Sequence, residues 1–319
     1  MAAGGSTRAI YMAFFANLGI SIAKFIGFLV TGSASMLAES VHSVADTGNQ
    51  GLLIFGNRQA KKTADIDHPF GYGRERYFWA FVVSLVLFSL GSLYAIYEGI
   101  EKIRHPHDID SLGWALGILG FAIVLEFFAF RTAVIESRKI KGDHSWPAFI
   151  RRARVPELPV VLLEDAGAMF GLVFAFVAIV LADVTGNSRW DGVGTLSIGI
   201  LLGIIAIILA VEMKSLLIGE GALPEQIDKI KTALNGHQDV DRLIHMRTQY
   251  MGPDEMLVAA KVHFRPGMST AELADAIDGA EKAIRDAVPV ARIIYLEPDL
   301  YEEDHTGISE LTDAHADDH

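Results

Sequence analysis

The chain has 319 residues, of which 51% are hydrophobic, and its mean hydropathy of +0.33 is high for a water-soluble protein. It contains no cysteine, which excludes disulfide bonds and thiolate metal sites. Its net charge is −12, and residues 221–319 carry most of it, with 20 acidic and 9 basic side chains. This acidic region argues against nucleic acid as a partner and suits metal cations, although an acidic surface can also serve solubility alone.

Six apolar segments are long enough to cross a hydrocarbon core about 30 Å thick as helices. They are Ile10–Val30, Ser33–Phe55, Trp79–Ile100, Leu112–Val134, Pro159–Leu181 and Val193–Ile218. The first lacks the cleavage site of a secretory signal, so we expect a helix of the mature protein. The sequence therefore predicts an α-helical membrane domain of six transmembrane helices in residues 1–220. Gly167-xxx-Gly171 and Gly199-xxx-Gly203 predict close helix contacts, unless their spacing is incidental.

The basic residues predict the topology. Residues 58–76 contain five Lys or Arg and residues 131–154 contain seven, whereas the opposite side has only Lys102, Arg104 and Arg189. Because basic loops stay in the cytoplasm, we expect both termini there. We expect a multi-pass protein of a bacterial inner (plasma) membrane.

The character of the chain changes after Gly221-Ala-Leu-Pro224. Helical and strand patterns alternate as α-β-β-α-β, at Glu225–Leu234, Arg242–Gln249, Met256–Phe264, Ser269–Ala287 and Ala291–Leu296. This order predicts a small cytoplasmic α+β domain in residues 221–300, with its helices on one face of a mixed sheet. Residues 301–319 are acidic, contain three His and lack an apolar core, so we expect a disordered tail.

A polar stripe marks the second apolar segment. Glu39, His42, Asp46 and Asn49 are spaced by three, four and three residues, which places them on one face of a helix. A charge at bilayer depth costs at least about 2.5–3.5 kcal/mol, so the stripe must face the bundle interior or an aqueous cavity. Imidazole and carboxylate are ligands of zinc and similar divalent cations. The alternative is a set of hydrogen bonds between helices.

The fifth segment supplies the complementary acids. We expect Asp165 to complete a metal site with His42 and Asp46, because bundles build such sites from facing helices. Glu164 points about 100° away from Asp165 and is a fourth ligand, a proton acceptor or the partner of Lys24. A water molecule could also fill the fourth position.

Four further polar residues in the spans are expected to support this site or couple it to protons: Glu39, Asn49, Glu126 and Lys24. Glu126 lies midway along the fourth segment and is a second candidate partner of Lys24. The loop from Asp65 to Arg76 places acids, His68 and a Gly-rich turn beside the stripe, which is a weaker sign of function.

Two motifs resemble those of the cation diffusion facilitator family. The segment Ser35–Asn49, with Met-Leu-Ala-Glu-Ser-Val-His42-Ser-Val-Ala-Asp46, is similar to the family's second-helix signature. His68-Pro-Phe-Gly-Tyr-Gly-Arg74 is similar to its His-x-Phe-Gly-x-Gly-basic motif. The resemblance covers residues 8–300 and implies six spans followed by a ferredoxin-like domain that forms a homodimer.

The resemblance implies export of a divalent metal in exchange for protons, with Zn²⁺ foremost and Mn²⁺, Fe²⁺ or Co²⁺ as alternatives. No cofactor beyond the transported metal is implied. The family's transport site falls on His42, Asp46, Val161 and Asp165, and Val161 departs from the usual His or Asp. Leu162-Leu-Glu164-Asp165 instead resembles the branch that contains the mitochondrial zinc exporter of animals, and that branch could use a reduced site.

Two secondary metal sites of the family are degraded here. The loop site corresponds to Asp65 and His68, with Tyr72 in place of a ligand. The cytoplasmic site corresponds to His263 and Glu297, with Tyr295 where His is common. We expect both to bind metal weakly or not at all.

Two other functions are open alternatives. An intramembrane metal-dependent enzyme would need a metal-activated water, with Glu164 as its base, but the sequence has no His-Glu-x-x-His motif. A membrane-embedded metal sensor would not need a polar stripe through the bilayer. Substitution of Asp46 separates a sensor from a transporter.

Overall fold

The computed structural model describes residues 34–106 and 112–301, together with scattered positions between 14 and 29. These residues belong to two compact units. The first lies within residues 1–63 and 75–215, and the second within residues 64–74 and 216–319. The first predicted span, Ile10–Val30, and the predicted tail after residue 301 fall largely outside the described residues.

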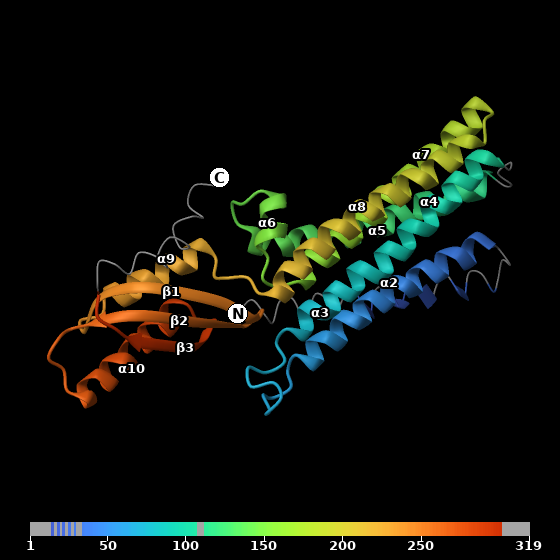
Figure 1. Ribbon diagram of the computed structural model, residues 1–319. Coiled ribbons are helices and arrows are strands. Elements are labelled where there is room, and N and C mark those ends of the chain that lie inside the picture. Colours follow the sequence, from blue (N-terminus) through green and yellow to red (C-terminus); the bar gives the residue numbers. More distant parts are fainter. Residues whose placement is uncertain are drawn as a thin grey trace. The chain divides into compact units, whose positions relative to one another are not determined.

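The first unit is built from helices, several of them long (Figure 1). In chain order they are α2 (Ala34–Gln59), α3 (Glu75–Val82), the π-helix η1 (Val83–Phe88), α4 (Ser89–Arg104), α5 (Leu112–Lys141), α6 (Trp146–Arg152), α7 (Glu157–Thr185) and α8 (Arg189–Ile218). Each of the five predicted spans after the first coincides with one of these helices or with the run from α3 to α4. The π-helix and the short α6 were not predicted.

Two of the described helices, α7 and α8, are long and apolar enough to cross a membrane by length and composition. Their bounds extend the predicted spans Pro159–Leu181 and Val193–Ile218 by two to four residues at most ends. The prediction of six spans is therefore supported at these two helices and stays a prediction for the others.

Glycines allow close contact between the helices, as their spacing predicted. A Cβ atom on Gly199 of α8 would lie 2.7 Å from the backbone nitrogen of Ile96 in α4, closer than real Cβ contacts. A Cβ on Gly167 of α7 would lie 3.0 Å from the side chain of Ile205 in α8. The Ser92 hydroxyl donates a 2.7 Å hydrogen bond to the Gly199 carbonyl, which joins α4 and α8 in their apolar interior.

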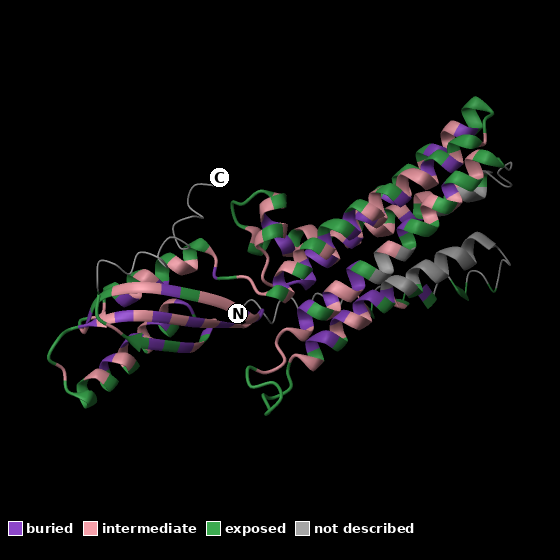
Figure 2. Ribbon diagram, viewed as in Figure 1, coloured by how far each residue is buried: buried purple, intermediate pink, exposed green. Residues whose placement is uncertain are grey.

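The second unit contains α9 (Pro224–Asn235), β1 (Val240–Gly252), β2 (Glu255–Phe264), α10 (Thr270–Ala287) and β3 (Ala291–Pro298). The strand order is β1-β2-β3, with β1 and β2 antiparallel and β2 and β3 parallel. Residues of β2 alternate between buried and half-buried, the period-2 pattern of a strand with one covered face (Figure 2). The predicted α-β-β-α-β order and mixed sheet are confirmed.

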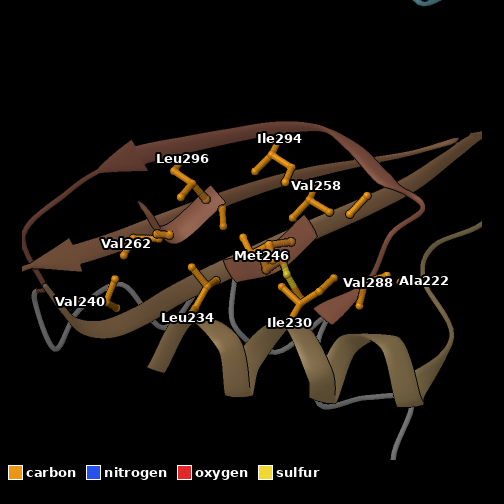
Figure 3. Packing of buried hydrophobic residues seen from close by; sticks show 14 of the residues in the cluster. Ala222, Ile230, Leu234, Val240, Met246, Val258, Val262, Val288, Ile294 and Leu296 are labelled. Carbon is orange, nitrogen blue, oxygen red and sulfur yellow. The ribbon is translucent and has the colours of Figure 1, made fainter. Parts of the chain in front are cut away.

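The core of this unit lies between one face of the sheet and both helices. Ile230 and Leu234 of α9 meet Met246, Val258 and other strand residues in one cluster (Figure 3). Ala276, Ala280 and Ile284 of α10 belong to the same cluster. Both helices therefore cover the same face, as predicted. The predicted start of α10 is also confirmed, because Ser269 and Glu272 form a capping box.

Residues 64–74 lie in the second unit, although they connect α2 to α3 of the first. Gly73 packs directly on the backbone of the β1–β2 turn, where a Cβ on Gly73 would lie 2.7 Å from the Met251 carbonyl oxygen and 3.1 Å from the Gly252 Cα atom. The Arg74 guanidinium lies 3.8 Å from the sulfur of Met251. The docked loop, residues 64–74, was not predicted as part of this unit.

Candidate metal-transport site

The predicted polar stripe lies on α2, which is helical throughout Ala34–Gln59. Helical geometry therefore holds Glu39, His42, Asp46 and Asn49 along one face. The side chains of Glu39, His42 and Asp46 lie outside the part of the chain that the structure describes, as does Lys24. Asn49 is described, and its side chain is buried.

Asn49 joins α2 to α7 within the bundle. Its amide nitrogen donates a 2.9 Å hydrogen bond to Oε1 of Glu164, across 115 residues of sequence. Asn49 and Glu164 are only 6% and 7% exposed. The buried contact therefore joins α2 to α7 at Asn49, the last residue of the predicted stripe, and at Glu164 of the acidic pair.

Asp165, the predicted principal ligand of α7, is half-buried and makes contacts of its own. Glu126 of α5 is likewise half-buried and has a partner. Among the described residues no group of three or more His, Asp or Glu is arranged to hold a metal ion.

Gln50 is a further buried polar residue beside the site. It is fully buried next to Asn49, and within the described residues neither atom of its side-chain amide has a hydrogen-bond partner. Helical spacing puts Gln50 one turn after Asp46. Gln50 follows Asp46 by four residues, so helical spacing could have included it in the predicted stripe. The stripe was instead continued to Asn49, three residues after Asp46.

Sequence reasoning missed a buried ion pair at the start of α3 and α7. The Nε and Nη2 atoms of Arg76 lie 2.5 and 2.9 Å from the two carboxylate oxygens of Glu157. Their side chains are 4% and 2% exposed. The next residue, Tyr77, donates a 3.1 Å hydrogen bond to the Arg154 carbonyl. The only sequence signal is the position of Arg76 at the end of the basic segment 58–76.

In the docked loop, Asp65 binds neighbours of its own loop. One carboxylate oxygen accepts a 2.7 Å hydrogen bond from the His68 backbone N–H, and the other accepts a 2.6 Å bond from the Tyr72 hydroxyl. The His68 ring lies 4.3 Å from the Tyr72 ring. The bond from Tyr72, followed by that from His68, lowers the pKa of the Asp65 carboxyl below its ordinary value.

The two predicted cytoplasmic ligands have separate partners. His263 lies within 3.1 Å of the Asp299 carbonyl and accepts a 3.1 Å hydrogen bond from the backbone N–H of Tyr301. Glu297 forms an ion pair with Lys261 at 3.2 Å, and Lys261 also contacts Asp299. These contacts with Asp299 and Glu297 raise the pKa of Lys261.

Comparison with known protein families accounts for both units. Residues 10–218 match the cation efflux transmembrane domain, and residues 222–299 match the cytoplasmic domain of cation efflux proteins. The chain belongs to the cation efflux family. It is therefore an integral membrane protein with a cytoplasmic domain, which agrees with the resemblance in its motifs.

Three relatives illustrate the range of the family. The human mitochondrial proton-coupled zinc antiporter SLC30A9 is 33% identical over 244 residues, which are 76% of this chain and 43% of the relative. Metal tolerance protein C4 of Arabidopsis thaliana is 29% identical over 265 residues, 82% of this chain and 58% of the relative. Magnetosome protein MamB of Magnetospirillum gryphiswaldense is 24% identical over 293 residues, about nine tenths of both chains. This chain thus spans less than half the length of the human zinc antiporter.

Proposed function

We propose that the protein is an efflux transporter for a divalent metal cation, foremost Zn²⁺, that works as a metal/proton antiporter by alternating access. The observation that carries the proposal is the buried hydrogen bond between Asn49 and Glu164, which joins the helix of the predicted stripe, α2, to α7. Membership of the cation efflux family and the zinc antiporter among its relatives support the same function.

In this proposal the metal ion is bound by His42, Asp46 and Asp165, with Glu164 as the fourth ligand. A ligating imidazole must be neutral and the carboxylates ionised, so metal binding displaces protons. After the bundle opens to the other side, protonation of the same groups favours release. Histidine suits this role because its ordinary pKa, about 6.5, lies close to physiological pH.

We further propose that the protein resides in a bacterial plasma membrane with both termini in the cytoplasm, and that its cytoplasmic domains form a homodimer. The many basic residues of loops 58–76 and 131–154 support the orientation. The match to the cytoplasmic domain of cation efflux proteins supports the dimer. The four weak positions, Asp65, His68, His263 and Glu297, are not part of the proposed transport site.

The test is metal-driven proton flux in proteoliposomes with Zn²⁺, Mn²⁺, Fe²⁺ and Co²⁺. We expect flux with Zn²⁺ in the natural chain and none in Asp46→Ala. Asp183→Ala, which removes an exposed carboxylate of α7, is the matched control and should transport normally. Metal binding that depends on Asp46 without flux of any ion would refute transport and favour a sensor or an enzyme.

The choice of metal has its own variant. His42→Asp replaces imidazole by a harder oxygen ligand, so preference should move from Zn²⁺ toward Mn²⁺. An unchanged preference for Zn²⁺ in this variant would exclude His42 from the ligand set.

A further inference from the structure

The buried ion pair between Arg76 and Glu157 is not part of the proposed metal site. It joins the first turn of α3 to the first turn of α7 with two parallel hydrogen bonds. Two such bonds between a guanidinium and a carboxylate are strong and fix the orientation of both groups. Tyr77 adds a bond to the Arg154 carbonyl, so adjacent residues of α3 hold the chain on both sides of Pro156.

A contribution to the stability of the fold does not by itself explain why a buried ion pair stands at this position. Replacing a buried ion pair by apolar residues of similar volume is often neutral or stabilising, because the charges lose their hydration on burial. Charged groups have one property that an apolar contact lacks: when the surfaces separate, water solvates both. An ion pair therefore suits an interface that closes and opens repeatedly.

The pair lies where its opening would change the access of water to Glu164. Glu157 precedes Glu164 by seven residues, which is two helical turns, so both lie on the same face of α7. Val160 lies between them on this face and is fully buried. Arg76 ends the basic segment 58–76, which is expected on the cytoplasmic side, so water is expected at this end of the helices. Separation of α3 from α7 at this pair would admit water along the face that leads to Glu164.

We propose that the Arg76–Glu157 pair is a gate between α3 and α7 that breaks and re-forms in each transport cycle, a proposal that rests on the transport function above. When paired, the two side chains close the route to Glu164 from this end of the helices. When separated, both are hydrated and the route is open.

Because the natural chain has no cysteine, one introduced cysteine can report on this route. Val160→Cys places a thiol between the gate and Glu164. Leu209→Cys places one at a fully buried position of α8 as the control. Both are labelled with a water-soluble maleimide in proteoliposomes, with and without Zn²⁺.

Two variants of the gate should change the extent of maleimide labelling at position 160 in opposite directions. Glu157→Gln removes one charge of the buried pair, so we expect labelling at position 160 to rise several-fold while labelling at 209 stays unchanged. The double variant Arg76→Met/Glu157→Leu keeps the contact closed, so labelling at 160 should fall to background. Its Zn²⁺ binding should persist, and its Zn²⁺ flux should fall at least about tenfold because opening becomes rate-limiting.

The control for replacing an ion pair by Met and Leu is the same double substitution at the exposed Arg285–Glu281 pair of α10. Arg285→Met/Glu281→Leu should transport Zn²⁺ like the natural chain. Natural flux in Arg76→Met/Glu157→Leu would overturn the gate, as would labelling that rises equally at positions 160 and 209. Absence of flux for every ion in the natural chain would instead refute the proposed transport function, and the gate with it.

Discussion

At the scale of single residues, the site depends on which of two adjacent acids faces α2. Glu164 and Asp165 point about 100° apart on α7, so the rotation of that helix decides which one meets the stripe. The hydrogen bond from Asn49 selects Glu164 and leaves Asp165 half-buried with other contacts. Tests of metal binding should therefore substitute Glu164 as well as Asp165.

Asn49→Leu tests this role of Glu164. The variant removes the donor to the carboxylate, and loss of such a supporting bond typically lowers metal affinity about 10–100-fold. Isothermal titration with Zn²⁺ measures the effect. Ser92→Ala, which removes a buried hydrogen bond between α4 and α8, is the control and should bind Zn²⁺ normally. Unchanged affinity in Asn49→Leu would place Glu164 outside the metal site.

Tyr72→Phe tests the exposed cluster of the docked loop. Loss of the phenol bond should raise the pKa of Asp65 toward its ordinary value. A lowered pKa in the folded state stabilises above the ordinary pKa, and this stabilisation is lost as pH falls through the lowered value. We therefore expect Tyr72→Phe to lose this stabilisation of the loop at neutral pH. A carboxyl NMR titration measures the pKa of Asp65, and loop proteolysis measures the stability of the loop. Tyr97→Phe, at an exposed position of α4, should leave both unchanged.

At the scale of helices and strands, local patterns were sufficient for most of the fold. Alternating residues predicted β2, the capping box predicted the start of α10, and apolar length predicted α7 and α8. Local patterns could not predict the π-helix η1, since no sequence signal distinguishes its turn from an α-helix. The Arg76–Glu157 pair spans 81 residues, and only the packing of α3 against α7 reveals it.

Gly199→Ala tests the close contact of α4 and α8. The added methyl group would lie 2.7 Å from Ile96, so we expect the variant to lose about 1–3 kcal/mol of unfolding free energy by overpacking. Gly120→Ala is the control, because its methyl group would meet nothing within 4 Å. Thermal unfolding in detergent compares the two. Equal stability of the variants would mean that the helices lie farther apart.

At the scale of the whole molecule, the chain passes three times between the two units: before the docked loop, after it, and in the last turn of α8. The second unit is therefore tied covalently to α2, the helix that carries His42 and Asp46, and to α3, the helix that carries Arg76. The sequence motif around His68 predicted a functional loop, but its docking on a turn about 180 positions later is a tertiary contact that spacing does not encode.

Gly73→Ala tests this docking. Its methyl group would lie 2.7 Å from the Met251 carbonyl oxygen, so the docked loop should detach from the β1–β2 turn. We expect faster tryptic cleavage at Lys61 and Lys62 and faster amide exchange at the turn, with Gly120→Ala unchanged. Protection equal to that of the natural chain would show that the loop stays docked despite the methyl group.

The Gly73–Gly252 contact also dictates an order of assembly. During synthesis the docked loop emerges about 180 residues before its binding surface, a delay on the order of ten to forty seconds at ordinary translation rates. The two helices that are long and apolar enough to cross a membrane, α7 and α8, are made in that interval while the loop is still undocked. A fragment that began after α8 would lack residues 64–74 and present bare backbone at Gly252, so the second unit is complete only when it is made together with the loop between α2 and α3.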